Sequence, residues 1–372
     1  MSERKVVLVD AVRTPWGKMN GSLSKLDSAD LAAALLTALA ERTQVDKEKI
    51  DHIIFGQSHP STSPNNMGHY ASLLARFPES IPGYTVHSNT ASGLQAMRSA
   101  YYLIASGNEK FCIAGGTDSY THAPFAIRDA RKSFPESSRM IIDTVDEAEY
   151  STQPEKINHA ERYEKVYGER GEDAYDYQIT SKKNAVLAEE NENENRIPVS
   201  YVERKKGEII VSADELLKDE SDPILPVYAD GAAAAMLMTA ELAEELGQKP
   251  IAEILGFAVA GGEPLEKQVP GALAVLKLLK RKNISMKDVS VMEIMENSAS
   301  EVLETVKVLQ ESEKILPKIN PSGGALSYGL NEGAEGLRMV IRLLSTLKSG
   351  ELGLICINAS GGQGMAALMK KY

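Results

Sequence analysis

The sequence predicts an α/β protein made of two duplicated βαβαβ-type halves, with a long inserted segment between them. Three observations support this fold class. The first part of the chain alternates strand-like apolar runs with helical patterns, the same segments recur in order near the C-terminus, and the region between is different in composition.

Short apolar runs rich in β-branched residues mark the first strands. Residues 6–12 (VVLVDAV) and 52–56 (HIIFG) have this composition, which is typical of β-strands. Between them, residues 31–42 (LAAALLTALAER) consist of good helix formers. Strand, helix and strand in short succession predict parallel strands joined by crossover helices.

A second helix and a buried strand follow. The helix is expected to begin near Ala91 and to end at Ser106, where Gly107 supplies the C-cap. The next run, FCIAGG (111–116), is apolar without alternation. Such a run is typical of a strand that is buried on both faces.

This helix and strand unit recurs near the C-terminus. Gly93 is followed 13 and 14 residues later by Ser106 and Gly107 and then by FCIAGG, while Gly336 is followed at the same offsets by Ser349 and Gly350 and then by LGLICINASGG. Upstream, KIDHIIFGQS matches DVSVMEIMENS, and VVLVDAVRTP matches PIAEILGFAVAGGEP more loosely. Because the matches keep one order, we infer an internal duplication.

The region between the repeats is charge-dense. It contains strand-like segments at 197–202 and 208–211, and residues 230–247 then read as a strand followed by a helix. We therefore expect an N-terminal half made of residues 1–117 and 230–248, an inserted loop domain over 118–229, and a C-terminal half over 249–372.

Composition excludes several classes of partner. The chain has 372 residues with 41 Lys+Arg against 52 Asp+Glu, a net charge of -11, so neither nucleic acid nor an anionic membrane is an expected partner. No apolar run approaches the roughly 20 residues of a membrane span, and MSERKVVLVD is not a signal peptide, so a cytoplasmic location is expected. Two cysteines, Cys112 and Cys356, form no disulfide framework or multi-thiolate zinc site. We expect no metal.

Six motifs resemble thiolase signatures in their order and spacing. They are VRTPWGKMNGSL near the start, HSNTASGLQAM (87–97), CIAGGTDS (112–119), VMEIMENSA (291–299), INPSGGALSYGLNEGAEG (319–336) and NASGGQGMA (358–366). The chain thus resembles the thiolase superfamily, which includes acetyl-CoA acetyltransferase and 3-ketoacyl-CoA thiolase. The resemblance implies the thiolase fold, with its halves in a layered α/β/α/β/α arrangement, and a homodimer in which FCIAGG pairs across subunits.

The catalytic positions of the family carry other residues in this sequence. Thiolases use a nucleophilic cysteine, an activating histidine and a second cysteine, and the resemblance places these at Thr90, Leu330 and Asn358. A threonine hydroxyl attacks a thioester only with a base beside it, so we expect Thr90 to cap the following helix instead. Leu330 is expected to serve only in packing, and the Asn358 amide has no usable acid–base equilibrium. Cys356 is expected to be a core residue.

The oxyanion and substrate positions also differ. The family's Asn-Glu-Ala-Phe motif begins here with Met295 and Glu296, so the asparagine donor is lost, an effect of about 3 to 4 kcal/mol for comparable donors. Pro226 takes the serine position near the CoA pantetheine arm, and Gly324 and Gly362 are assigned to substrate binding. Because proline lacks an N–H, a CoA ester is expected to bind weakly, and no other cofactor is expected.

These departures predict a catalytically degenerate thiolase-like protein that acts as an acyl-thioester-related binding or partner subunit. Its partner would be a second copy, or a hetero-partner thiolase or condensing enzyme, and standard thiolase activity is predicted absent. The alternative is an active acyl-CoA acyltransferase, or a thioester hydrolase, with chemistry built from Thr90, Asn358, Glu296 or Glu332. A third possibility is a structural paralogue without a ligand. A carboxylate or imidazole within about 3.2 Å of the Thr90 hydroxyl, in an open pocket, would favour the alternative, whereas a hydroxyl bonded only to the helix backbone would count against it.

Overall fold

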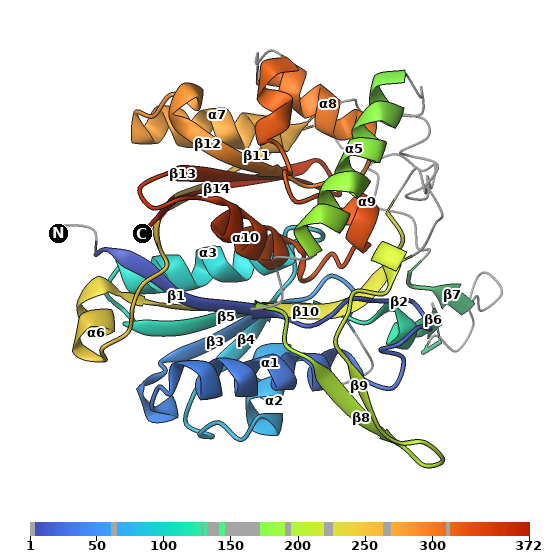
Figure 1. The fold of residues 1–372 in the computed structure, drawn as a ribbon. Helices are drawn as coiled ribbons and strands as arrows, with labels where there is room; N and C mark the ends of the chain where they lie inside the picture. Colours follow the sequence, from blue (N-terminus) through green and yellow to red (C-terminus); the bar gives the residue numbers. More distant parts are fainter. Residues whose placement is uncertain are drawn as a thin grey trace.

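The computed structural model describes residues 4–60, 65–127, 130–131, 141–145, 172–189, 195–218, 226–262, 269–309 and 313–372. Much of the predicted inserted domain, including residues 146–171, lies outside these ranges. Figure 1 shows two layers of strands, with helices above them, between them and below them. This is the predicted α/β/α/β/α order.

Five strands of the N-terminal half form the lower layer of strands in Figure 1. They are β1 (Val6–Arg13), β10 (Ala229–Thr239), β5 (Phe111–Asp118), β3 (His52–Gly56) and β4 (Gly83–Val86), in that spatial order. β3 runs parallel to β4 and β5, while β10 is antiparallel to both β1 and β5. The predicted parallel strands are therefore present, with one antiparallel strand inserted between β1 and β5.

Four strands of the C-terminal half repeat this arrangement. They are β12 (Val289–Ile294), β13 (Leu352–Ala359), β14 (Gln363–Lys371) and β11 (Ala252–Gly261), in that spatial order. β12 and β13 are parallel, and β14 is antiparallel to β13 and β11. The order β12-β13-β14-β11 matches β3-β5-β10-β1 strand by strand and direction by direction. The predicted internal duplication is confirmed.

Equivalent helices occupy equivalent layers. α1 (Ser28–Thr43) and α2 (Met67–Leu74) cover the outer face of the N-terminal strands, and α7 (Pro270–Lys282) and α8 (Ala299–Val308) cover that of the C-terminal strands (Figure 1). α3 (Ser92–Ala105) and α10 (Glu335–Thr346) pack against each other between the two layers of strands. Both central helices begin at the same end of the molecule.

The remaining elements are short or peripheral. They are β2 (Gly17–Lys18), β6 (Phe125–Ile127), β7 (Ile141–Asp143), β8 (Val199–Glu203), β9 (Gly207–Val211), α5 (Glu172–Glu189), α6 (Ala240–Glu245), α9 (Ala325–Tyr328) and the 3-10 turns η1 (Lys47–Lys49), η2 (Tyr120–His122), η4 (Leu216–Lys218), η5 (Met286–Asp288) and η6 (Glu313–Lys318). In the described residues, no helix is both long and apolar enough to cross a bilayer.

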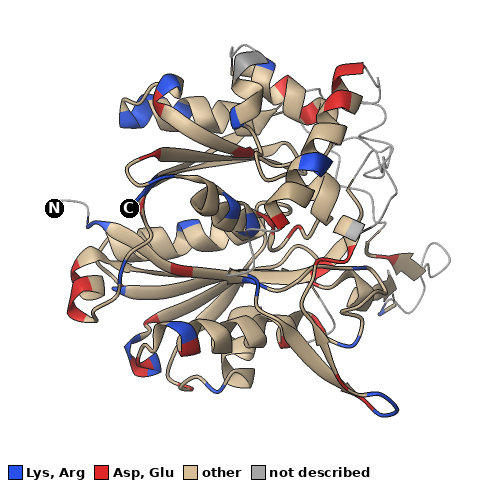
Figure 2. Cartoon of the chain, viewed as in Figure 1, with Lys and Arg blue, Asp and Glu red and all other residues tan. Residues whose placement is uncertain are grey.

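Charged residues lie mainly on the outer helices and loop tips, and α10 is an exception between the layers (Figure 2). Arg338 is 1% exposed and pairs with Glu335 at 2.6 Å. The Arg342 guanidinium lies 4.1 Å from the ring centre of Tyr328. Buried charges are tolerated where they are paired or stacked on an aromatic ring.

The strand FCIAGG does not lie at an edge. It is β5, all eight of its residues are buried, and it is hydrogen-bonded to β10 on one side and β3 on the other. The expectation that this strand pairs across subunits is wrong, because neither of its backbone edges is available. The edge strands of the sheet are β4 and β12.

Candidate active site

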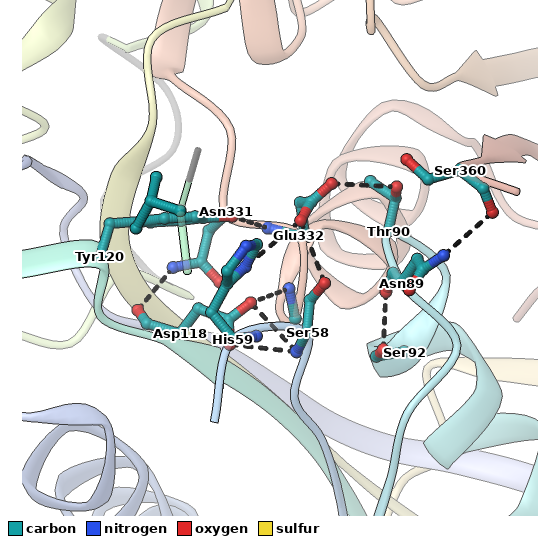
Figure 3. A network of polar contacts seen from close by, with 12 residues as sticks. Ser58, His59, Asn89, Thr90, Ser92, Asp118, Tyr120, Asn331, Glu332 and Ser360 are labelled. Carbon is teal, nitrogen blue, oxygen red and sulfur yellow. Dashed lines mark hydrogen bonds and ion pairs between the residues drawn. The ribbon is translucent and has the colours of Figure 1, made fainter. Parts of the chain in front are cut away.

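The candidate site lies where α3 begins, beside the loop that leads into α10. Thr90 precedes α3 and is 1% exposed. Its Oγ1 donates a hydrogen bond to Oε1 of Glu332 at 3.3 Å (Figure 3). Because the two central helices begin at the same end, the fold brings these residues together from opposite halves of the chain.

The predicted cap of α3 is not formed. The N-cap position is Ala91, which makes no side-chain hydrogen bond to the helix, and the Thr90 hydroxyl points to Glu332 instead. Residues other than Thr90 close the turn before the helix. Asn89 adopts a left-handed φ of 48°, and Ser92 Oγ donates to the Asn89 carbonyl at 2.6 Å. The expectation that Thr90 caps the helix is therefore wrong.

The Glu332 carboxylate contacts two further polar side chains. Its Oε2 accepts a hydrogen bond from Ser58 Oγ at 3.0 Å and lies 3.4 Å from Nδ1 of His59. Its backbone N–H donates to Tyr120 Oη at 3.2 Å. The Glu332 side chain is 5% exposed. A single buried carboxylate thus connects a threonine, a serine and a histidine.

Asn331 holds the loop that carries Glu332. Its Nδ2 donates to the carbonyl oxygens of Asp118 and Ala229, each at 2.8 Å, and its Oδ1 accepts from Ala334 N at 3.0 Å. Asn331 is fully buried. This side chain ties the loop before α10 to the ends of β5 and β10, which sets the position of Glu332.

Asp118 joins the loop that carries Ser58 and His59 to the loop that carries Glu332. It accepts hydrogen bonds from the backbone N–H groups of His59 at 2.9 Å and Gly333 at 2.7 Å, and Ser58 N lies 3.1 Å from it. Burial raises the pKa of Asp118 well above its usual range, and the Glu332 charge adds to this, against the lowering effect of the three N–H donors. Two acidic groups are therefore buried close together.

Ser58, His59 and Asp118 were not singled out from the sequence. Ser58 and His59 follow β3 and Asp118 is the last residue of β5, and these two strands are adjacent and parallel. Ligand sites of α/β sheets form at the carboxyl ends of such strands. The polar residues directly after the buried runs HIIFG and FCIAGG were therefore a usable signal.

Leu330 lies in the core beside the segment after Pro226. It is 3% exposed, its N–H donates to the Val227 carbonyl at 2.8 Å, and its carbonyl accepts from Ala229 N at 2.9 Å. Pro226 is half-buried. The backbone after Pro226 is therefore bonded within the protein at Val227 and Ala229.

Asn358 joins three elements, and the turn that follows it reaches the Thr90 segment, because Asn89 Nδ2 donates to the Ser360 carbonyl at 3.0 Å. Asn358 Oδ1 accepts from Gly271 N at the start of α7 at 2.7 Å, and its Nδ2 donates to Thr305 Oγ1 on α8 at 3.1 Å. Asn297 Nδ2 donates to its carbonyl at 2.7 Å. Cys356 lies on the same face of β13, also against Gly271, and burial raises the pKa of its thiol.

Glu296 forms a separate buried cluster. Its carboxylate accepts four hydrogen bonds, from Tyr177 Oη at 2.9 Å, Ser181 Oγ at 2.8 Å, Asn320 Nδ2 at 3.1 Å and Leu326 N at 3.0 Å. Burial raises the pKa of Glu296, although these donors oppose the shift. Gly324 lies directly against it, because a Cβ there would overlap the carboxyl group. Its neighbour Met295 is fully buried.

The other assigned positions make their contacts elsewhere. The Gly362 carbonyl accepts a hydrogen bond from Gly262 N at 2.7 Å, which joins the turn between β13 and β14 to the end of β11. Among residues in the described ranges, no three His, Cys, Asp or Glu side chains are grouped so that they could hold a metal ion. Of the positions that the resemblance assigns, Thr90 is the one that contacts the Glu332 carboxylate.

The chain is similar to known proteins along nearly its whole length. Residues 6–223 match the thiolase N-terminal domain and residues 248–371 the thiolase C-terminal domain. The chain is 32% identical to the beta-ketoadipyl-CoA thiolase of Pseudomonas putida, with 99% of this chain and 100% of that one covered. It superposes on the Bacillus anthracis acetyl-CoA acetyltransferase with a TM-score of 0.91 at 26% identity, covering 100% of both chains. For Acat5 thiolase from Ascaris suum in complex with coenzyme A, the TM-score is 0.88 at 27% identity, over 99% of this chain and 100% of that one. The chain belongs to the thiolase family.

Proposed function

We propose that this protein is an active acyl-CoA acyltransferase in which Thr90 is the nucleophile and Glu332 is its general base. The contact of Thr90 Oγ1 with Glu332 Oε1 at 3.3 Å carries the proposal. The relatives support it, because they are named as thiolases and acetyl-CoA acyltransferases. The degenerate subunit expected from the sequence has no comparable support in the comparisons.

The contact supplies what a threonine nucleophile requires. An un-ionised hydroxyl attacks a thioester when an adjacent base removes its proton. In catalytic sites without substrate such contacts are often long and shorten when the substrate binds. Because Thr90 is 1% exposed, access of the thioester to its hydroxyl requires a local opening of the surrounding loops.

The acyl transfer then proceeds in two steps. Thr90 Oγ1 forms a bond to the thioester carbonyl carbon while its proton moves to Glu332, and the carbon–sulfur bond breaks so that CoA leaves as a thiolate with the bonding electron pair. Before the second step Glu332 releases this proton, and the departed CoA thiolate takes one up. An acceptor thiol or water then attacks the threonine ester and gives its own proton to the regenerated carboxylate. The threonine oxygen takes back a proton as it leaves.

Carbon–carbon bond formation is not part of this proposal. Asn358 is bonded to Gly271 and Thr305, and Leu330 is buried with its backbone paired, so neither removes a proton from an acyl α-carbon. Standard thiolase activity therefore stays predicted absent. CoA affinity stays predicted weak because Pro226 lacks the N–H of a ligand-binding loop.

The decisive experiment compares matched variants with the wild-type protein. CoA release is measured with a panel of acyl-CoA esters, and the acyl-enzyme is sought by intact mass, with hydroxylamine used to cleave an ester. We expect Thr90→Val to abolish the acyl adduct and Glu332→Gln to lower turnover by about 10² to 10⁴-fold. Thr37→Val on α1 and Glu109→Gln at the surface serve as controls. Turnover that persists in Thr90→Val would rule out Thr90 as the nucleophile, and no turnover in the wild type would instead support the binding-subunit function.

We also propose a homodimer, since thiolases commonly form homodimers or tetramers. β4 is an edge strand of the sheet and can pair with a second copy. Light scattering at micromolar concentration tests this. A monomer would contradict it, and a stable complex with another thiolase or condensing enzyme would indicate a hetero-partner instead.

A further inference from the structure

His59 connects the buried Glu332 carboxylate to the protein surface. Along the path from Thr90 to Glu332 to His59, side-chain exposure rises, since the residue Thr90 is 1% exposed, the Glu332 side chain 5% and the His59 side chain 15%. The contact distances on this path are 3.3 Å and 3.4 Å. Figure 3 shows the three side chains in this order.

The imidazole is held in place from several sides. Its backbone N–H donates to Asp118, and its ring lies against Tyr120, with 4.8 Å between ring centres, and beside Tyr228 at 6.3 Å. Tyr120 and Tyr228 are themselves stacked at 4.4 Å. These contacts hold the ring with Nδ1 3.4 Å from Oε2 of Glu332.

A buried general base must release its proton before the next turnover. Of the ionisable groups that face His59, Asp118 is fully buried and has no route to solvent, and burial raises the pKa of Tyr120 well above its usual range. Tyr120 therefore stays neutral and does not take up a proton. Tyr228 contacts the imidazole through its ring. His59 is the facing group that also has exposed surface, and an imidazole can accept a proton at one ring nitrogen and release one from the other.

We propose that His59 carries the Thr90 proton from Glu332 to solvent. This rests on the proposed function. Glu332 passes the proton from Oε2 to Nδ1 of His59, and the imidazole releases a proton from Nε2 to water, where the departed CoA thiolate takes one up. His59 thus acts through Glu332 as a positioning and proton-transfer residue and does not touch the acyl group.

The kinetic test uses a matched histidine pair elsewhere in the chain. His52 Nδ1 lies 3.3 Å from Glu109, with 19% side-chain exposure, outside the site. In His59→Asn we expect kcat to fall at least tenfold with KM little changed, the corresponding limb of the pH–rate profile to disappear, and added imidazole to restore part of the rate. His52→Asn should behave as wild type. Wild-type kcat and pH profile in a folded His59→Asn protein would overturn the relay while leaving the proposed function intact.

A second readout does not depend on turnover. The imidazole of His59 is titrated by NMR in the wild type and in Glu332→Gln. Because a neighbouring carboxylate stabilises the imidazolium, its midpoint should fall when the charge is removed, while that of His52 stays unchanged. An unchanged His59 midpoint would overturn the pairing and with it the relay. Absence of any Thr90-dependent turnover would overturn the proposed function and the relay together, whatever the titration shows.

Discussion

Gly116 on β5 lies directly against the carbonyl oxygen of Gly333, so close that a β-carbon at position 116 would overlap that oxygen. Gly333 follows Glu332 in the chain. The missing side chain therefore sets how near the Glu332 loop comes to the N-terminal sheet, and with it the contact between Glu332 and Thr90.

We expect Gly116→Ala to displace this loop. The added methyl group overlaps backbone that has little room to move, and overpacking of this kind costs about 1 to 3 kcal/mol. Turnover should fall with stability, because Glu332 moves away from Thr90. Denaturant midpoints and CoA release measure the two effects. Gly261→Ala is the control, since a β-carbon there meets nothing within 4 Å, and equal behaviour of the two variants would contradict the prediction.

Asp214 should make stability depend on acid pH. It is buried and pairs with Arg13 at 2.6 Å and Arg196 at 3.0 Å. Burial favours the neutral acid, but the two guanidinium groups outweigh it and hold the pKa of Asp214 well below its usual range. Its stabilising effect is therefore complete above the unfolded pKa of about 4 and is lost as the pH falls through the folded pKa.

We expect Asp214→Asn to lower the free energy of unfolding by about 3 to 5 kcal/mol at pH 7, as for other broken buried ion pairs. The difference from wild type should shrink below pH 4. Asp10→Asn is the control, because Asp10 pairs with the more exposed Arg42, and surface pairs contribute about 0 to 1 kcal/mol. Urea unfolding over a pH series measures both. A pH-independent difference for Asp214→Asn would be inconsistent with this account.

Asn358→Ala should destabilise the protein without changing its chemistry. The substitution leaves the buried Gly271 N–H without its partner, at about 1 to 3 kcal/mol, and removes one of the two hydrogen bonds of Thr305 Oγ1. Asn108→Ala on an exposed turn should stay within about 0.5 kcal/mol of wild type. Thermal unfolding and CoA release are the measurements. A fall in kcat at full stability would show that Asn358 takes part in the reaction.

Thr90→Cys tests the electrostatics of the site. The Glu332 charge disfavours a thiolate beside it, so the introduced thiol should react slowly with iodoacetamide. Adding Glu332→Gln should raise the alkylation rate severalfold. Cys112 and Cys356 are fully buried, and burial raises the pKa of both thiols, so they serve as internal references in peptide mass spectrometry. No increase in the double variant would mean that the carboxylate does not face position 90.

Much of the fold was accessible from the sequence. The strands at 6–12, 52–56 and 111–116 and the repeat of FCIAGG as LGLICINASGG correspond to β1, β3, β5 and β13. Local composition and glycine spacing are sufficient here, because apolar β-branched runs form buried strands wherever the chain places them. The domain boundaries at 117, 230 and 248 stay a prediction.

The site depended on tertiary structure. Thr90 and Glu332 are 242 positions apart, and the sequence around Thr90 predicted a helix cap. Whether a hydroxyl bonds the helix backbone or a distant carboxylate depends on which acceptors the fold brings near it, and that information is not local. For the same reason Ser58, His59 and Asp118 meet only because β3 and β5 are adjacent and parallel. The sequence by itself determined which segments form strands and helices, whereas the packing of the two halves decided which polar groups face one another.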